Sequence, residues 1–85
     1  MKYTVEVTAK ARKSLEKIDP IFAKKIRDRL RSLEENPRPH DCLNLEGSKD
    51  AYRTKVGRYR IVYKILDSKV YVVVVNIDHR KDIYR

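Results

Sequence analysis

The chain begins with alternating apolar and polar residues and then changes to a helical repeat. In residues 3–7, Tyr3, Val5 and Val7 alternate with polar positions, which predicts a short strand with one buried face. Further along, apolar side chains recur three or four residues apart, as they do along one side of a helix. These positions are Ala11, Leu15, Ile18, Phe22, Ile26, Leu30 and Leu33.

Local signals divide this helical stretch into two parts. Thr8 precedes the repeat and suits the N-cap of a helix. Asp19 and Pro20 interrupt it, because aspartate caps a helix well and proline fits the first helical position. We therefore predict helices over about 9–18 and 20–35, forming a hairpin or a kinked pair. The prolines at 37 and 39 end the second helix, and a loop follows to about residue 50.

Three more strands are predicted in the second part of the chain. In residues 51–56, Arg53 and Lys55 share one face. After a tight turn or bulge at Gly57 and Arg58, residues 59–66 place Arg60 on one face and the apolar and aromatic residues at odd positions on the other. A two-residue turn at 67–68 leads to residues 70–77, which are apolar at nearly every position, as in a strand covered on both sides.

These elements predict an α+β fold in the order βααβββ with a short C-terminal extension. Residues 1–85 would form a single domain, an antiparallel-rich sheet with a helical hairpin packed on one face. Because the helices cover the apolar face, we expect the face with Arg53, Lys55 and Arg60 to stay open.

The charge of the chain is strongly basic and concentrated towards its end. The 85 residues include 21 Lys and Arg and 12 Asp and Glu, a net charge of +9. Residues 1–50 contribute +3 and residues 51–85 contribute +6. A field of this sign attracts polyanions, of which nucleic acid is the commonest, although an acidic protein or an anionic membrane would also respond to it.

The cations on the open face suggest a phosphate site. Cross-strand pairing brings Arg53 or Lys55 close to Arg60, and like charges placed side by side repel unless they share an anion. The alternative is a solvated outer face without a ligand. Further polar residues follow the last strand, namely His79, Arg80 and Tyr84.

Several other classes of protein are not indicated. Cys42 has no second cysteine to pair with, and no stretch approaches the roughly 20 apolar residues of a membrane span. His40, Cys42 and His79 match no metal-ligand spacing, and there is no glycine-rich phosphate loop. We therefore expect a cytoplasmic protein with no cofactor, no metal and no membrane association.

The segment LNLEGSKDAYRTKVGRYRIVYKI, the valine-rich strand and the ending HRKDIYR resemble the RelE branch of the RelE/ParE toxin superfamily. The resemblance covers nearly the whole chain. It implies a ribosome-dependent endoribonuclease that cuts mRNA in the ribosomal A site and is neutralised by a RelB-like antitoxin. In such an enzyme the 2′-hydroxyl attacks the adjacent phosphate and leaves a 2′,3′-cyclic phosphate, without a metal.

The same resemblance assigns roles to individual residues. Lys55 would be the general base, Arg53 and Arg60 would hold the scissile phosphate, and Arg80 would protonate or stabilise the leaving group. Tyr84 would orient the nucleotide. Arg58 and His79 are expected to contact RNA, and His79 could instead share the acid–base chemistry.

Two alternatives remain open from the sequence. A ParE-like member of the superfamily would poison DNA gyrase by binding, without nuclease chemistry. A small nucleic-acid-binding module without toxicity would explain the charge, but not its concentration near the strand ends. The set of Arg53, Lys55, Arg60, Arg80 and Tyr84 favours the ribonuclease.

Overall fold

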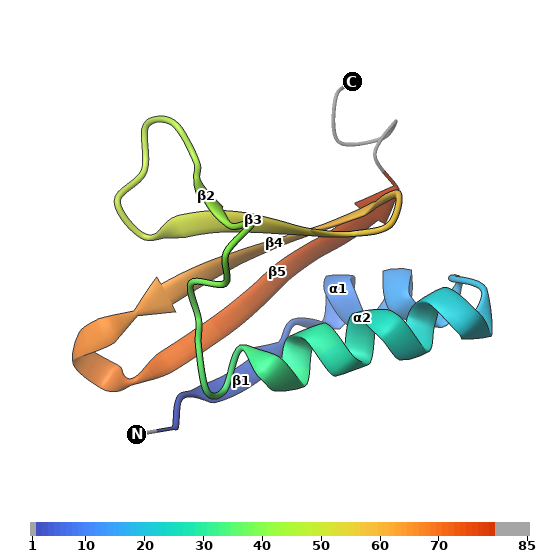
Figure 1. Ribbon diagram of the computed structural model, residues 1–85, viewed down its shortest axis with the longest axis horizontal. Helices are drawn as coiled ribbons and strands as arrows, with labels where there is room; N and C mark the ends of the chain where they lie inside the picture. Colours follow the sequence, from blue (N-terminus) through green and yellow to red (C-terminus); the bar gives the residue numbers. More distant parts are fainter. Residues whose placement is uncertain (1, 80–85) are drawn as a thin grey trace.

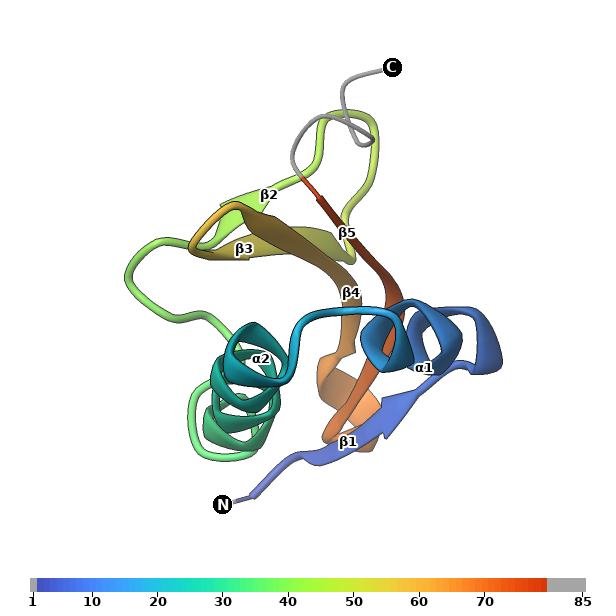
Figure 2. The same cartoon turned by 90° about the vertical axis from the view of Figure 1, so that its right-hand side faces the viewer.

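Two helices lie against one face of a five-stranded sheet in the computed structural model, which describes residues 2–79 (Figure 1). Helix α1 contacts β5 and helix α2 contacts β3. Both helices lie below these strands in Figure 1, and Figure 2 views the helices roughly end-on. In chain order the elements are β1 (Thr4–Val7), α1 (Ala9–Glu16), α2 (Pro20–Ser32), β2 (Leu43–Asn44), β3 (Ala51–Val56), β4 (Tyr59–Leu66), the 3-10 turn η1 (Asp67–Lys69) and β5 (Tyr71–His79).

The strands lie in the order β1-β5-β4-β3-β2, so the first strand of the chain pairs with the last. This pairing of β1 with β5 is parallel, and the other three pairings are antiparallel. The predicted α+β class, with an antiparallel-rich sheet and helices on one face, is therefore confirmed.

The short strand β2 was not predicted, because residues 36–50 were expected to form only a loop. Leu43 and Asn44 pair with Arg53 and Tyr52 of β3. The side-chain nitrogen Nδ2 of Asn44 also donates to the carbonyl oxygen of Ala51 at 2.9 Å. Two residues are too few to show a periodic pattern, so this strand could not be recognised from the sequence. It forms by pairing with β3.

Both predicted helix caps are present. The Thr8 hydroxyl accepts a hydrogen bond from the backbone N–H of Ala11 at 3.2 Å, and the Asp19 carboxylate accepts one from Ile21 at 3.0 Å. Pro20 begins α2. The helices end at Glu16 and Ser32, earlier than predicted, because the following residues make turn-like hydrogen bonds to carbonyls three residues back.

The core lies between the helices and the facing side of the sheet. The odd-numbered residues of β4 belong to it, as predicted, and Tyr63 is fully buried. Its hydroxyl donates to the carbonyl oxygen of Pro37 at 2.8 Å, which satisfies the buried polar group. The other members are Ala11, Leu15, Ala23, Ile26, Leu30, Leu33, Val56, Ile61, Ile65, Val72, Val74 and Ile77.

A β-bulge divides β5 into two parts. Val62 pairs with Asn76 but Tyr63 pairs with Val74, so Val75 is an extra residue. Because side chains alternate between faces, this one-residue slip exchanges the faces of all later positions. The prediction that this strand is covered on both sides is wrong, since Val73 and Val75 are only partly buried on the side away from the helices.

The connection between β4 and β5 also differs from the predicted two-residue turn. Residues Asp67–Lys69 form a 3-10 turn, and Val70 follows in the left-handed region with φ 52°. A β-branched residue rarely adopts this conformation, so this turn is strained.

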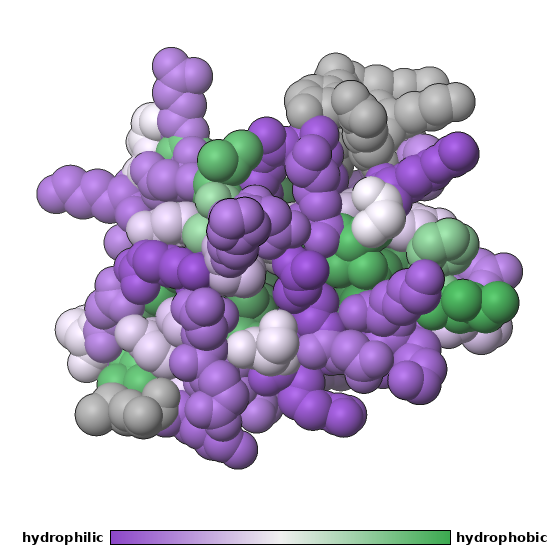
Figure 3. Space-filling view, viewed as in Figure 1, coloured by the Kyte–Doolittle hydropathy of each residue, from purple (hydrophilic) through white to green (hydrophobic). Residues whose placement is uncertain are grey.

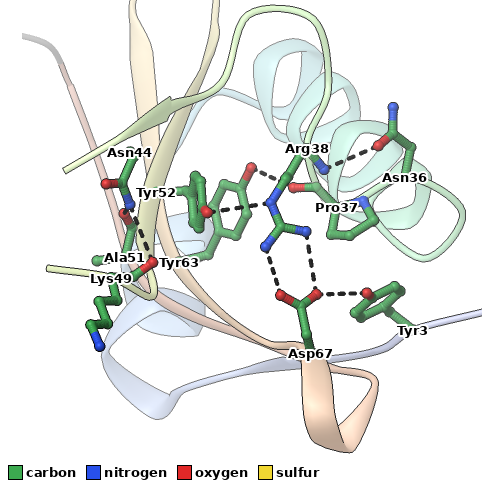
Figure 4. A network of polar contacts seen from close by, with 10 residues as sticks. All are labelled: Tyr3, Asn36, Pro37, Arg38, Asn44, Lys49, Ala51, Tyr52, Tyr63 and Asp67. Carbon is green, nitrogen blue, oxygen red and sulfur yellow. Dashed lines mark hydrogen bonds and ion pairs between the residues drawn. The ribbon is translucent and has the colours of Figure 1, made fainter.

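A polar network fixes the long connection that leads from α2 to β2 (Figure 4). The Arg38 guanidinium donates to the Asp67 carboxylate at 2.7 Å and to the Tyr52 hydroxyl at 3.3 Å. The Tyr3 hydroxyl donates to the same carboxylate at 2.8 Å. Arg38 thereby joins the connection to β3 and to the β4–β5 turn. Asp67 in turn joins that turn to Tyr3 at the start of the chain.

None of the helices between residues 2 and 79 is long and apolar enough to cross a membrane.

Candidate functional site

The β3–β4 hairpin brings three of the predicted cations to the sheet face away from the helices. Lys55 lies directly opposite Arg60, and Arg53 lies on the same face, two residues earlier and opposite Val62. Directly opposed residues have Cβ atoms roughly 4.5–5.5 Å apart. The register therefore confirms that these three residues share a face.

Their exposure differs, and the expectation of a fully open cationic face is wrong for Arg60. Lys55 is exposed and Arg53 is half-buried, whereas Arg60 is only 2% exposed. Arg60 lies on β4, which is flanked by β3 and β5, so its neighbours restrict access to its side chain. A buried guanidinium requires opposite charge or hydrogen bonds nearby.

A carboxylate lies across the strand pair from Arg60 at Asp78, a residue that the sequence did not single out. Asp78 of β5 is the partner of Arg60 on the side away from Lys55. The Asn76 side chain donates to the Asp78 carboxylate at 2.6 Å and orients it. Finding Asp78 from the sequence required knowledge of the bulge at Val75, because a regular strand would place Asp78 on the other face.

A small hollow lies at the turn between β3 and β4. It has a volume of about 100 Å³ and is lined by Lys55, Gly57, Arg58, Tyr59 and Arg60. Gly57 has φ +60°, which L side chains rarely adopt. Three cations around so small a space provide charge-assisted donors for an anion such as a phosphate.

His79 is the last residue of β5, so its predicted place beyond the strand is wrong. The bulge turns it to the side of the helices, where its ring meets the Tyr59 ring edge-on at 5.4 Å between centroids. Tyr59 in turn packs against Phe22 of α2 at 5.7 Å. The predicted RNA contact of His79 would therefore lie at the end of β5, on the side of the sheet that faces the helices.

A polar cluster behind the cationic face was also missed. Thr54 lies between Arg53 and Lys55 but points to the helices and is fully buried. Arg29 of α2 donates to the Thr54 hydroxyl at 2.5 Å, and that hydroxyl donates to the Asp41 carboxylate at 2.8 Å. Burial works to raise the pKa of Asp41, but the hydrogen bonds from Thr54 and Arg29 outweigh it, and the pKa lies below its ordinary value.

The two predicted tail residues, Arg80 and Tyr84, lie outside the described residues. The part of the predicted site that the structure brings together is thus Arg53, Lys55 and Arg60 on one face, with Arg58 at the turn beside them.

Comparison with known proteins adds a family to this geometry. The family described as "ParE toxin of type II toxin-antitoxin system, parDE" matches residues 5–84. Toxin RelG of Mycobacterium tuberculosis is 37% identical over 87 residues, which cover 100% of this chain and 99% of RelG. The mRNA interferase toxin RelE of Escherichia coli K12 is 29% identical over 83 residues, or 95% of this chain and 86% of RelE.

The fold agrees with the sequence comparison. The toxin–antitoxin complex RelBE2 of Mycobacterium tuberculosis contains a chain that superposes with a TM-score of 0.83 at 28% identity, covering 94% of this chain and 100% of that one. The family match spans nearly all of the sequence, and the structural match includes both helices and the sheet that carries the cations. The chain belongs to the RelE/ParE superfamily of toxins from type II toxin–antitoxin systems.

Proposed function

We propose that this toxin is a ribosome-dependent endoribonuclease that cuts mRNA in the A site. The observation that carries the proposal is the grouping of Lys55, Arg58 and Arg60 around the hollow at the β3–β4 turn, with Arg53 on the same face. The relative at 29% identity that is named an mRNA interferase supports the same activity.

The reaction needs no group beyond those of the RNA and the toxin. The 2′-hydroxyl attacks the adjacent phosphorus, the bond from phosphorus to the 5′-oxygen breaks, and the products are a 2′,3′-cyclic phosphate and a 5′-hydroxyl. The neutral amine form of Lys55 accepts the proton of the 2′-hydroxyl, and the exposed position of Lys55 gives it access to the substrate. Arg53 and Arg60 stabilise the charge on the phosphorane, Arg80 protonates or stabilises the leaving oxygen, and Tyr84 orients the nucleotide.

The burial of Arg60 suits this role. A guanidinium held within the sheet beside Asp78 is fixed in place before the substrate arrives, so little reorganisation is needed when charge develops. Lys55 on the neighbouring strand remains exposed. The pair therefore combines one rigid and one accessible cation at opposed positions.

We also propose a RelB-like antitoxin as the cognate partner. Solved relatives such as RelBE2 of Mycobacterium tuberculosis and RelBE of Escherichia coli are toxin–antitoxin complexes. An antitoxin that neutralises the activity would restrict access of RNA to the cationic face.

A second candidate is a ParE-like toxin that binds DNA gyrase without cutting RNA. The description of the matching family favours it. In that case the cations would serve binding alone, and the opposed Lys55 and Arg60 would have no chemical step to perform.

The test is cleavage of mRNA on programmed ribosomes by the wild-type toxin and by Lys55→Ala. We expect the wild type to cut in the A site and leave the cyclic phosphate, and Lys55→Ala to lose about 10²- to 10⁴-fold in rate. Lys64→Ala is the matched control, because Lys64 is exposed on the same face of β4 but lies outside the cation group.

A wild-type rate for Lys55→Ala would refute its role as the base. If the wild type leaves mRNA intact and inhibits supercoiling by gyrase, the second candidate replaces the first. Circular dichroism of each variant confirms that the fold is unchanged.

A further inference from the structure

A second pocket lies around the end of the sheet from the cations, on the side of the helices. It has a volume of about 290 Å³ between the end of α1 and the ends of β4 and β5. The side chains that matter here are Ser14, Lys17, Tyr59 and His79. Of these four, only His79 was expected from the sequence to contact RNA.

The lining has the chemistry of a nucleotide site. Tyr59 and His79 offer aromatic rings. The bases of single-stranded RNA stack on such rings largely independently of sequence. Lys17 is exposed at the rim and supplies a cation for a phosphate, and Ser14 supplies a hydroxyl.

Tyr59 lines both this pocket and the hollow at the β3–β4 turn, so the two lie next to each other around the end of the sheet. Arg58 is exposed at the turn itself. A strand of RNA with a phosphate at Lys55 and Arg60 would pass Arg58 on its way around the sheet end to the pocket.

Apolar side chains are exposed on the surface next to this pocket. Ile21 and Phe22 at the start of α2 are 68% and 36% exposed, and Figure 3 shows an apolar patch at this end of an otherwise mostly hydrophilic view. The Lys25 ammonium lies 5.5 Å from the centre of the Phe22 ring. Aromatic rings interleaved with cations extend from Phe22 through Tyr59 to His79.

We propose that this pocket binds the base and phosphate of a nucleotide that flanks the scissile phosphate. This proposal rests on the ribonuclease function. It makes Tyr59, His79 and Lys17 determinants of RNA binding, and not catalytic residues, because they lie around the sheet end from Lys55.

The test is the affinity of the purified toxin for a 2′-O-methyl RNA trinucleotide, which cannot be cut because the attacking hydroxyl is blocked. We expect His79→Ala and Lys17→Ala each to weaken binding about tenfold or somewhat less, the effect of one lost stacking or phosphate contact. Lys13→Ala is the charge-matched control, since Lys13 is exposed one turn earlier on α1 and does not line the pocket. Its affinity should stay within about twofold of the wild type.

Amide chemical shifts of the labelled toxin locate the trinucleotide independently of the variants. Shifts at residues 14–18 and 77–79 support the pocket, and shifts confined to β3 and the open face of β4 overturn it. Equal loss in Lys17→Ala and Lys13→Ala also overturns it, because the effect would then be one of general charge.

The two proposals fail separately. If the wild type cuts mRNA but the His79 and Lys17 variants bind like the wild type, the pocket is wrong and the ribonuclease stands. If the wild type does not cut mRNA yet the trinucleotide shifts the pocket residues, the pocket binds nucleotides and the ribonuclease is wrong.

Discussion

At the scale of single residues, the cationic face depends on a polar cluster behind it, in which Thr54 is fully buried. Thr54 separates Arg53 from Lys55 along β3, and its hydroxyl joins Arg29 of α2 to Asp41 of the following connection. Arg29 also pairs directly with Asp41 at 3.0 Å. These hydrogen bonds set the spacing between β3 and α2, and thereby the positions of Arg53 and Lys55 on the other face of the strand.

The pH dependence of stability should report on this cluster. Because the pKa of Asp41 is lower in the folded chain than in the unfolded chain, its contribution is complete above the unfolded value of about 3.9 and is lost as the pH falls through the folded value. We expect Asp41→Asn to lower the free energy of unfolding by about 1 kcal/mol at pH 7, given its partial exposure. The difference from the wild type should shrink below about pH 4.

Urea unfolding between pH 3 and pH 7 measures this difference. Asp28→Asn is the control, since Asp28 forms an exposed pair with Lys24 within α2 at 3.4 Å and should change stability by only a few tenths of a kcal/mol. A difference between the wild type and Asp41→Asn that is constant down to pH 3 would contradict the assignment.

At the scale of elements, periodicity in the sequence was sufficient for the regular parts and failed at the irregular ones. The bounds of β3 and β4 and both helix caps follow from local patterns, because alternation and capping are properties of neighbouring residues. The bulge at Val75 gives no such signal within a run of valines. That single residue decides that Asp78 faces Arg60 and that His79 faces Tyr59, so these parts of the site could not be predicted.

The positions of the cations were likewise predictable only in part. Alternation predicted that Arg53, Lys55 and Arg60 share a face, and this is confirmed. It could not predict that Arg60 is buried, because burial depends on which strands lie on either side of β4. Strand order is a property of long-range pairing, and β1 and β5 are separated by almost the whole chain.

The turn between β4 and β5 is strained at Val70, and substitutions at this position can measure the strain. Val70 has φ 52°, a conformation that costs an L residue roughly 1–2 kcal/mol and glycine very little. We expect Val70→Gly to be more stable than Val70→Ala by about 1 kcal/mol in thermal or urea unfolding. Both variants lack the valine side chain, so the lost packing cancels between them.

Ser68 in the same turn provides the matched comparison, because its φ is not positive. There Ser68→Gly should be less stable than Ser68→Ala, since glycine gains more freedom on unfolding. The same order at both positions would show that the left-handed conformation of Val70 is not the source of strain.

At the scale of the whole molecule, the net charge of +9 and the local cations would make separable contributions to the proposed RNA binding. The overall field attracts a polyanion from a distance and is screened by salt, whichever surface the RNA finally contacts. Cations that touch phosphates release bound counterions. Each such contact therefore steepens the dependence of affinity on salt concentration by about 0.7 in a plot of log K against log salt for a single strand.

Two exposed lysines, one near the start of β4 and one just after its end, distinguish these contributions. Lys55 lies beside the β3–β4 turn, whereas Lys69 lies in η1 at the other end of the sheet (Figure 1). Each alanine variant removes one charge and lowers the net charge equally. We expect Lys55→Ala to reduce the slope for an uncut 2′-O-methyl RNA by about 0.7, and Lys69→Ala to leave it unchanged. The measurement is affinity by fluorescence anisotropy at several salt concentrations. Equal slopes for the two variants would mean that RNA responds to the total charge of the toxin, and that the opposed Lys55 and Arg60 do not form its binding site.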